Sequence, residues 1–344
     1  MKRIKVDALI PGDIVLTASK TAAGKGIRTT TCAIVSHAMI CVGNGSVIDS
    51  TGDGVQARNV QRELFKPLEQ VYAFRLREPL DKARLDQVVN FARSEIGTRY
   101  SAPEAVRSVV AGRKPRGRRQ FCSRLVARAY AHAGVNLVED EDYCTPEELG
   151  LSPLVVELHD ITETVSDAEL AAWRSRPDPI AMTHAAQNEI LEGVRRLSPG
   201  VEHFGDLDQV VREHPEWDLG IAALFRSSGY LDLWRNDFAV NPWHYDVDAM
   251  EAVANDANRD DIRGYCRSII AEAVSGGQRY RTMLEYHRQS HRLMPRQTTF
   301  QLVELYGQLV SNDARLRATA CEWLNRHYPD DLDAYLERAD PMPA

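Results

Sequence analysis

The sequence changes character near residue 160, and this change limits the folds available to the chain. Before it, short apolar runs alternate with turn signals such as Gly43-Asn44-Gly45. After it, nearly every segment has the three- and four-residue apolar spacing of a helix. Ser166 and Glu169 form a capping box where the helical half begins. We therefore expect an α+β domain over residues 1–160, a linker over 160–166, and an all-α domain of unknown role over 167–344.

The pattern of each half also predicts individual elements. In the first half we expect strands over 14–18, 70–76 and 154–158, a hairpin over 31–50, helices over 81–96, 103–111 and 121–134, and loops over 19–30 and 113–119. In the second half we expect helices near 167–174, 180–197, 207–213, 216–227, 248–256, 260–275, 278–292, 298–311, 313–327 and 331–338.

The helix expected over 121–134 carries a cysteine in its first turn. Its apolar residues share one face, and Gly134 is a natural stop. At Cys122 the unpaired N–H groups and the helix dipole favour the thiolate over the thiol. The loop over 113–119 adds five cationic side chains that act in the same sense. Taken alone, a small buried hydrophobic side chain is the commoner role of such a cysteine.

A histidine and an acidic residue upstream favour a catalytic role for Cys122 over a packing role. Within the hairpin expected over 31–50, residues 36–50 supply two apolar runs and the turn between them, with His37 near the start of the first strand and Asp49 near the end of the second. Those positions are cross-strand neighbours in a short hairpin, so Asp49 can orient the His37 imidazole. With Cys122 they make a Cys-His-Asp constellation.

Several short motifs accompany this constellation in a particular order. They are Pro11-Gly12-Asp13-Ile14-Val15-Leu16, the His37 hairpin, Ile96-Gly97-Thr98-Arg99-Tyr100, Cys122-Ser123 at the start of a helix ending in Ala133-Gly134, and Thr145-Pro146-Glu147-Glu148-Leu149 followed by Ser152-Pro153. Over roughly residues 1–160 the chain resembles the NlpC/P60 papain-like cysteine hydrolases. Because the histidine precedes the cysteine, it resembles their permuted, YiiX/YebB-like branch.

The resemblance implies a fold and a set of site residues. The fold would be a circularly permuted papain-like domain, with a small antiparallel β-sheet packed on helices. Cys122, His37 and Asp49 would be catalytic, and Tyr100 and Ser123 would bind the oxyanion or substrate. A buried tyrosine that ties a loop to the core is an equally weighted interpretation of Tyr100. Arg124 stands where the unpermuted family usually has glycine, at a position we expect beside the site entrance.

The implied activity is that of a thiol-dependent acyl hydrolase, an amidase or peptidase or else a thioesterase or esterase, working through an acyl-enzyme. Its substrate would be a peptide, an amide or a lipid, and it would need no metal or organic cofactor. His287 and His291 have the spacing of metal ligands but no evident third ligand. The alternatives are a lipid or protein acyltransferase on the same triad, or a non-catalytic partner-binding or effector module.

The distribution of charge and the cysteines bear on binding partners and on the redox compartment. Residues 1–160 carry 23 Lys/Arg and 19 Asp/Glu, a net of +4, and the remainder carries 19 and 30, a net of −11. The total of −7 argues against nucleic-acid binding, and the acidic helical half is a candidate surface for a protein partner. The six cysteines, none in a Cys-x-x-Cys pair, indicate a reducing compartment.

The sequence also bears on location. The basic N-terminus has no apolar run behind it, so no signal peptide is expected. No stretch approaches 18 apolar residues, so we expect no membrane span. The expected location is the cytoplasm, with export as an effector by a route without such a signal as the alternative.

Overall fold

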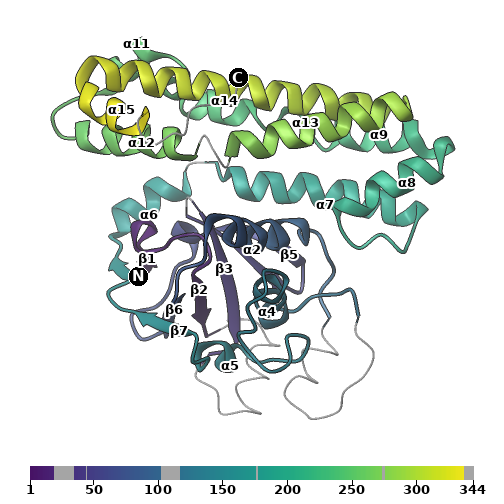
Figure 1. Ribbon diagram of the computed structural model, residues 1–344, viewed down its shortest axis with the longest axis horizontal. Helices are drawn as coiled ribbons and strands as arrows, with labels where there is room; N and C mark the ends of the chain where they lie inside the picture. The colour runs from purple at the N-terminus through teal and green to yellow at the C-terminus, as the bar shows by residue number, and fades with distance from the viewer. Residues whose placement is uncertain (19–34, 44, 102–116, 176, 273–275, 337–344) are drawn as a thin grey trace. The chain divides into compact units, whose positions relative to one another are not determined.

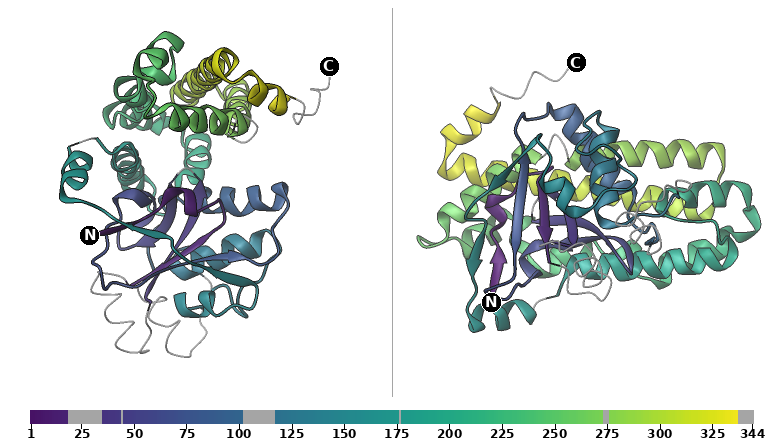
Figure 2. Two further views of the ribbon diagram at one scale, coloured as in Figure 1. Left: turned by 90° about the vertical axis from the view of Figure 1, so that its left-hand side faces the viewer. Right: turned by 90° about the horizontal axis from the view of Figure 1, so that it is seen from below.

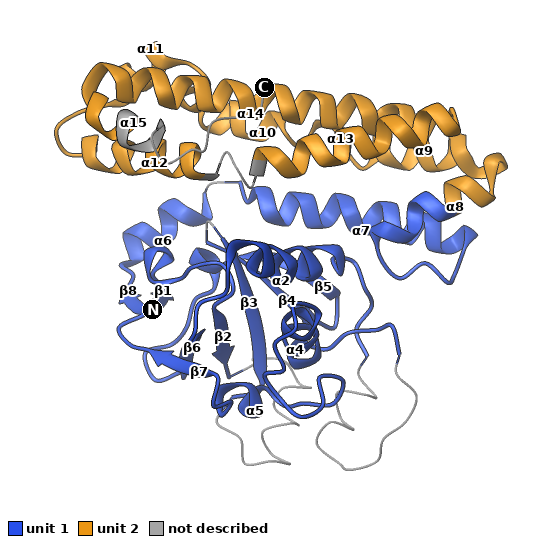
Figure 3. Cartoon of the chain, viewed as in Figure 1, with its two compact units in different colours: residues 1–209 blue, residues 210–344 orange. Residues whose placement is uncertain are grey.

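The computed structural model describes residues 1–18, 35–43, 45–101, 117–175, 177–272 and 276–336. The chain divides into two compact units, Met1–Gln209 and Val210–Ala344 (Figure 3). The expected loop over 19–30, the expected helix over 103–111 and Cys32 lie outside the described residues.

A six-stranded antiparallel sheet organises the first unit (Figure 1). Its strand order is β5-β4-β3-β2-β6-β7, so the His37 hairpin, β3 with β4, lies beside β2. The bounds are β2 (Ile14–Thr17), β3 (His37–Gly43), β4 (Ser46–Thr51), β5 (Gly54–Asn59), β6 (Val71–Leu76) and β7 (Val155–Leu158).

Alternate residues of this sheet contribute to two apolar layers. Ile14, Ala38 and Ile48 join the buried residues of α2 (Lys82–Ser94) and α4 (Cys122–His132), which pack on one face (Figure 2). Val15 and Met39 point to the other face, where segments from both ends of the α+β region cover them. The expected helices over 81–96 and 121–134 are therefore present, and both pack against the sheet.

The expectation of a linker over 160–166 is wrong in part. Within it, β8 (Thr162–Thr164) pairs antiparallel with β1 (Lys2–Ile4), and Arg3 binds Glu163 at 2.6 Å. Three-residue strands are too short to show a period, and this one depends on a partner at the far end of the domain. The capping box of Ser166 and Glu169 is confirmed at the start of α6 (Asp167–Arg174).

Helix α7 (Pro179–Leu197) belongs to the first unit and packs beside β5. Its Asn188 accepts a hydrogen bond from Gln56 at 3.1 Å. Its Leu191 lies against Gly97, whose φ of +91° and lack of a Cβ permit the close approach. Arg195 donates to the Gly97 carbonyl at 2.7 Å. α7 is thus fixed to the segment that leads to Tyr100.

The second unit is helical, as the sequence predicts. Its longer helices are α9 (Asp218–Ser227), α12 (Arg259–Glu272), α13 (Gly276–Leu293) and α14 (Gln297–His327), with shorter α10 (Arg235–Val240), α11 (Val247–Val253) and α15 (Pro329–Leu336); α8 (Leu207–Glu213) spans the boundary between the units.

Helix α14 corrects one expectation. The sequence predicts two helices, 298–311 and 313–327, but a single helix of 31 residues covers both. No glycine or proline interrupts it at the expected break, and Asn312 is accommodated by a hydrogen bond from Gln308 at 2.7 Å. Asp218 of α9 caps its first turn by accepting from the N–H groups of Gln297 and Thr298, at 2.7 and 3.0 Å.

Two further expectations concern the described residues. None of the helices there is long and apolar enough to cross a membrane. His291 is hydrogen-bonded to Thr299 at 2.8 Å, and the His287 ring stacks on Tyr306, so both histidines of the metal-like spacing have packing contacts within the second unit.

Candidate active site

Cys122 is the first residue of α4, which begins directly after the extended Phe121. Phe121, the N-cap residue, offers this end of the helix no side-chain hydrogen bond. Its first-turn N–H groups and the positive end of the helix dipole therefore act at Cys122. The residue is buried in the core between α4 and the sheet, with 6% of its surface exposed.

His37 and Asp49 meet beside it. Asp49 lies directly opposite Met39 in the β3–β4 register, so His37, two residues earlier on the same strand, is its diagonal rather than its direct neighbour. The side chains still touch, with 2.9 Å between His37 Nε2 and Asp49 Oδ2. Because a carboxylate accepts, Nε2 carries the proton, and Nδ1 is the nitrogen left for Cys122.

The surroundings of His37 favour the imidazolium. Burial, the largest influence, lowers its pKa, but hydrogen bonding to Asp49 and Cys122 and the charges of both groups outweigh burial and raise the pKa to about 10. Asp49 is itself buried, at 1% exposure. His37 therefore interacts with both other members of the constellation expected from the sequence.

Arg58 of β5 is a further polar residue at this site, and sequence reasoning missed it. Its Nε donates to Asp49 Oδ2 at 2.7 Å, and its Nη2 donates to Thr51 Oγ1 at 3.2 Å. On the sequence alone, Arg58 is an arginine that follows the expected hairpin. Its contact with Asp49 follows from the β4–β5 register, which sets Gln56 opposite Asp49 and cannot be read from the sequence.

Tyr100 lies next to the segment that leads into α4. Its backbone forms a parallel bridge with Gln120, and the Ser101 N–H donates to the Gln120 carbonyl at 2.9 Å. Burial, and then the nearby charge of Cys122, raise the pKa of the Tyr100 phenol, which keeps it a hydrogen-bond donor. The loop-tying role and the site role weighed for Tyr100 are therefore compatible.

Ser123 and Arg124 make structural contacts. The Ser123 hydroxyl is buried and donates to the Cys144 carbonyl at 2.6 Å, so any contact of Ser123 with substrate would come from its backbone N–H. The expectation that Arg124 lies beside the site entrance is wrong, because this side chain is fully buried. Its Nε and Nη1 donate to the Asp142 and Arg119 carbonyls at 2.8 and 2.9 Å.

Cys41 and Cys144, the other cysteines of the first unit that the structure describes, are buried. Cys41 lies in the core, and burial, the largest influence, raises its pKa to about 11. Burial likewise raises the pKa of Cys144. Neither is suited to act as a thiolate near neutral pH.

A short segment after α7 holds the chain on both sides of residues 101–117. Glu202 lies 3.6 Å from Arg99 and 3.8 Å from Arg119, and Asp206 lies 2.7 Å from Arg118. The Pro199 carbonyl accepts from Arg99 at 3.2 Å. The residues that precede Tyr100 and those that precede Cys122 in the sequence are therefore both bound to one segment of the same unit.

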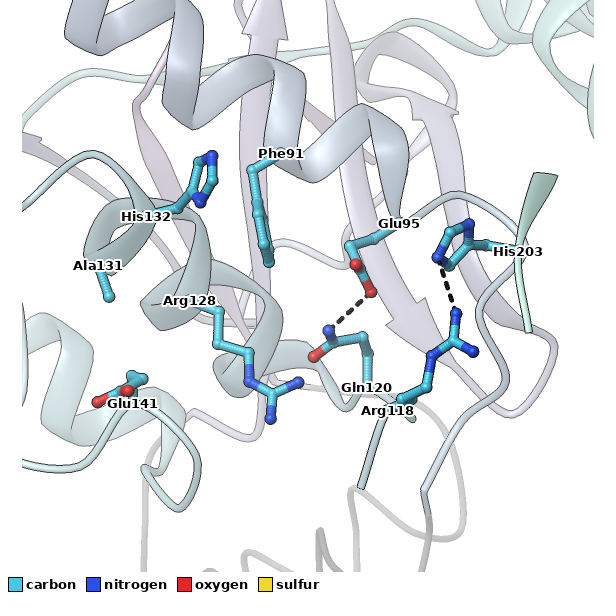
Figure 4. Close-up of a pocket in the computed structure, with 9 residues that line it drawn as sticks. All are labelled: Phe91, Glu95, Arg118, Gln120, Arg128, Ala131, His132, Glu141 and His203. Carbon is cyan, nitrogen blue, oxygen red and sulfur yellow. Dashed lines mark hydrogen bonds between the residues drawn. The ribbon is translucent and has the colours of Figure 1, made fainter. Parts of the chain in front are cut away.

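A pocket of about 430 Å³ opens between α2 and α4 (Figure 4). Gln120 reaches it and donates to Glu95 at 2.7 Å, and the Phe91 and His132 rings pack together on another side. Cys122 and His37 are not among its lining residues, which are Phe91, Glu95, Arg118, Gln120, Arg128, Ala131, His132, Glu141 and His203.

No group of three or more His, Cys, Asp or Glu side chains within the described ranges is arranged to hold a metal ion.

Comparison with known proteins finds a match over the same part of the chain. Residues 8–144 match the family described as permuted papain-like amidase enzyme, YaeF/YiiX, C92 family. A solved structure, that of metalloprotein yiiX from Escherichia coli O157:H7, is similar at 15% identity with a TM-score of 0.32, covering 43% of this chain and 95% of that chain. No curated protein matches. The resemblance to the permuted papain-like hydrolases is thereby confirmed for residues 8–144, the segment that carries Cys122, His37 and Asp49.

Proposed function

We propose that the chain is a thiol-dependent amidase of the permuted papain-like type, with Cys122 as nucleophile, His37 as general base and acid, and Asp49 as the group that orients His37. One observation carries the proposal: within the segment that matches an amidase family, the His37 ring is hydrogen-bonded to Asp49 at 2.9 Å and interacts with Cys122.

The acylation step follows from this arrangement. The Cys122 thiolate attacks the carbonyl carbon of the amide, and a C–S bond forms while the carbonyl oxygen gains negative charge. His37 then passes its proton to the departing amine as the C–N bond breaks. Asp49 holds the ring through Nε2, so that Nδ1 faces the reacting atoms. The product of this step is a thioester on Cys122.

Water then resolves the thioester. His37, now neutral, takes a proton from the water as the water attacks. The C–S bond then breaks, the carboxylic acid leaves, and the thiolate of Cys122 and the protonated His37 are restored. In both steps the oxyanion is met by the backbone N–H at the start of α4 and by the Tyr100 hydroxyl. Tyr100→Phe is expected to lower kcat about 10- to 100-fold with KM nearly unchanged.

We further propose that the catalytic unit extends beyond the first 160 residues to the end of Met1–Gln209. The support is the set of contacts that α7 and the following segment make with Gly97, Arg99 and Arg118, the last at 2.7 Å from Asp206. Residues 210–344 carry no catalytic group in this proposal.

Reactivity of Cys122 tests the function before a substrate is known. Limiting iodoacetamide is followed by peptide mapping between pH 5 and pH 9, with the half-buried Cys321 as the reference thiol in the same sample. Cys122 is expected to react faster than Cys321 and to keep that lead at mildly acidic pH. His37→Ala is expected to remove the lead, and Asp49→Asn to reduce it. Equal reactivity of the two thiols, unchanged in His37→Ala, would refute the thiolate–imidazolium pair.

A panel of acyl amides, thioesters and phospholipids then tests the reaction. An intact-mass increase equal to the acyl group, absent in Cys122→Ala, would identify the acyl-enzyme and the substrate class. Release of the acyl group to an amine or lipid in place of water would replace hydrolysis by acyl transfer on the same residues.

A further inference from the structure

Two cationic side chains share one oxygen of the buried Asp49. Oδ2 accepts from His37 Nε2 at 2.9 Å and from Arg58 Nε at 2.7 Å. Oδ1 has no hydrogen-bond partner among the described residues. The carboxylate is 1% exposed, so its charge is balanced locally by these two partners rather than by water.

Arg58 is fixed in this position by the sheet. It lies on β5, two residues after Gln56, which is opposite Asp49 in the ladder. Its Nη2 bonds to Thr51 Oγ1 at 3.2 Å, so a planar guanidinium spans two residues of β4. Burial lowers its pKa, but the charge of Asp49 and their hydrogen bond outweigh burial and raise the pKa.

Other titratable groups of the described residues interact with this cluster. Asp53 and Glu63 also stabilise the charge of Arg58. From α7, His184 approaches Arg58, and burial followed by that positive charge lowers the His184 pKa, so His184 stays neutral where His37 is charged. From α4, Cys122 faces His37. Among the described residues, Arg58 is therefore the cation that shares Asp49 with His37.

We propose that Arg58 is a positioning residue of this site: it holds Asp49 by the same oxygen that His37 uses, and so limits how tightly His37 keeps its proton. The inference rests on the proposed function and adds a member to its triad. A general acid must release its proton during the reaction. A buried carboxylate paired with His37 alone would hold the imidazolium more strongly than one shared with a guanidinium.

The sign of the effect of removing Arg58 follows from electrostatics. Two groups bonded to one oxygen at 2.7 and 2.9 Å have charges a few ångström apart. Loss of the guanidinium charge at that separation is expected to raise the pH at which His37 loses its proton by about one unit or more. If Arg58 served only as scaffold, its loss would free Asp49 to move away, and that pH would fall.

The experiment reads His37 directly. In a Cys122→Ala background, the His37 ring signal is followed by NMR as the pH is raised; this background removes the contribution of Cys122, which raises the His37 pKa, and so brings the titration into an accessible range. Arg58→Met is expected to move the midpoint up by about one unit or more. Arg58→Lys, which keeps the charge, is expected to move it much less. An unchanged or lowered midpoint in Arg58→Met would overturn the proposal.

Two controls make the result specific. Arg62→Met removes an arginine of similar exposure, 24% against 28%, that pairs with Asp178 instead, and is expected to leave the midpoint in place. Arg58→Gln keeps a donor for Asp49 without the charge. It repeats the test if Arg58→Met does not fold, with the same upward shift expected.

Iodoacetamide labelling of the chain with Cys122 intact separates this inference from the proposed function. One outcome is that labelling of Cys122 depends on His37, but the pH at which that dependence is lost is no higher in Arg58→Met than in wild type. In that case the proposed role of Arg58 is wrong and the triad stands. If Cys122 reacts as an ordinary thiol with or without His37, the proposed function fails.

Discussion

Gly97→Ala is expected to loosen the contact between α7 and the segment that leads to Tyr100. Gly97 has a φ of +91°, a conformation that costs a residue with a Cβ about 1–2 kcal/mol. A Cβ there would also overlap the Leu191 side chain, which is fully buried and cannot turn into solvent. Overlap of this kind typically costs about 1–3 kcal/mol. The expected loss in unfolding free energy is therefore about 2–5 kcal/mol.

Calorimetry measures the loss, and hydrogen exchange assigns the transition to residues 1–209. For a unit of this size the expected fall in Tm is roughly 4–20 °C. Gly134→Ala is the matched control, since Gly134 has a φ of +76° in the same unit and its nearest neighbour is the end of Arg84 at 3.6 Å. It should show the backbone strain alone, about 1–2 kcal/mol.

A double-mutant cycle isolates the overlap. Leu191→Ala alone costs about 2–5 kcal/mol by leaving a cavity. In its presence Gly97→Ala should cost no more than Gly134→Ala, because the added methyl group then enters empty space. Strictly additive effects of Gly97→Ala and Leu191→Ala, or equal effects of Gly97→Ala and Gly134→Ala, would refute the reasoning.

Three further outcomes are expected. The pKa of His37 is about 10 in the folded chain and 6.5 in its ordinary, unfolded state, so its contribution to stability is full below pH 6.5 and is lost as the pH rises through 10. The unfolding free energies of wild type and His37→Ala, measured in urea, should therefore differ most near pH 6 and converge toward pH 10. A difference that stays constant with pH would contradict this. Asp218→Ala should cost about 1–3 kcal/mol and increase hydrogen exchange at the start of α14, with Asp218→Asn milder. Arg124→Met should lower the unfolding free energy in urea by about 2–4 kcal/mol, because it removes buried hydrogen bonds, yet leave the pH profile of Cys122 labelling unchanged. A changed profile would mean that Arg124 does influence Cys122.

The sequence predicts those parts of the site that depend on local pattern. Cys122 lies at the start of a helix because apolar spacing and Gly134 mark both ends of that element. The His37 hairpin is recognisable from its turn and its flanking apolar runs, and its short span brings Asp49 within 2.9 Å of His37 even though the pairing is diagonal.

Residues whose roles depend on distant partners could not be predicted in this way. The contact of Arg58 with Asp49 depends on the register of a third strand. Arg124 is buried because the carbonyl groups of Arg119 and Asp142 and two aromatic rings surround it, and none of these is signalled by its own position in the helix. The packing of Leu191 on Gly97 joins residues nearly a hundred positions apart.

The pairing of β1 with β8 bears on how such a chain can be rearranged at the level of its gene. Lys2 lies opposite Thr164, so the two ends of the α+β region are neighbours in space. Residues 77–79, between β6 and α2, are exposed. A coding sequence that began at α2 and later returned to β1 would keep every strand pair while placing Cys122 before His37. The order of Cys122 and His37 along the chain is thus set by where such a rearranged gene begins, and the packing of the two residues can remain the same under either order.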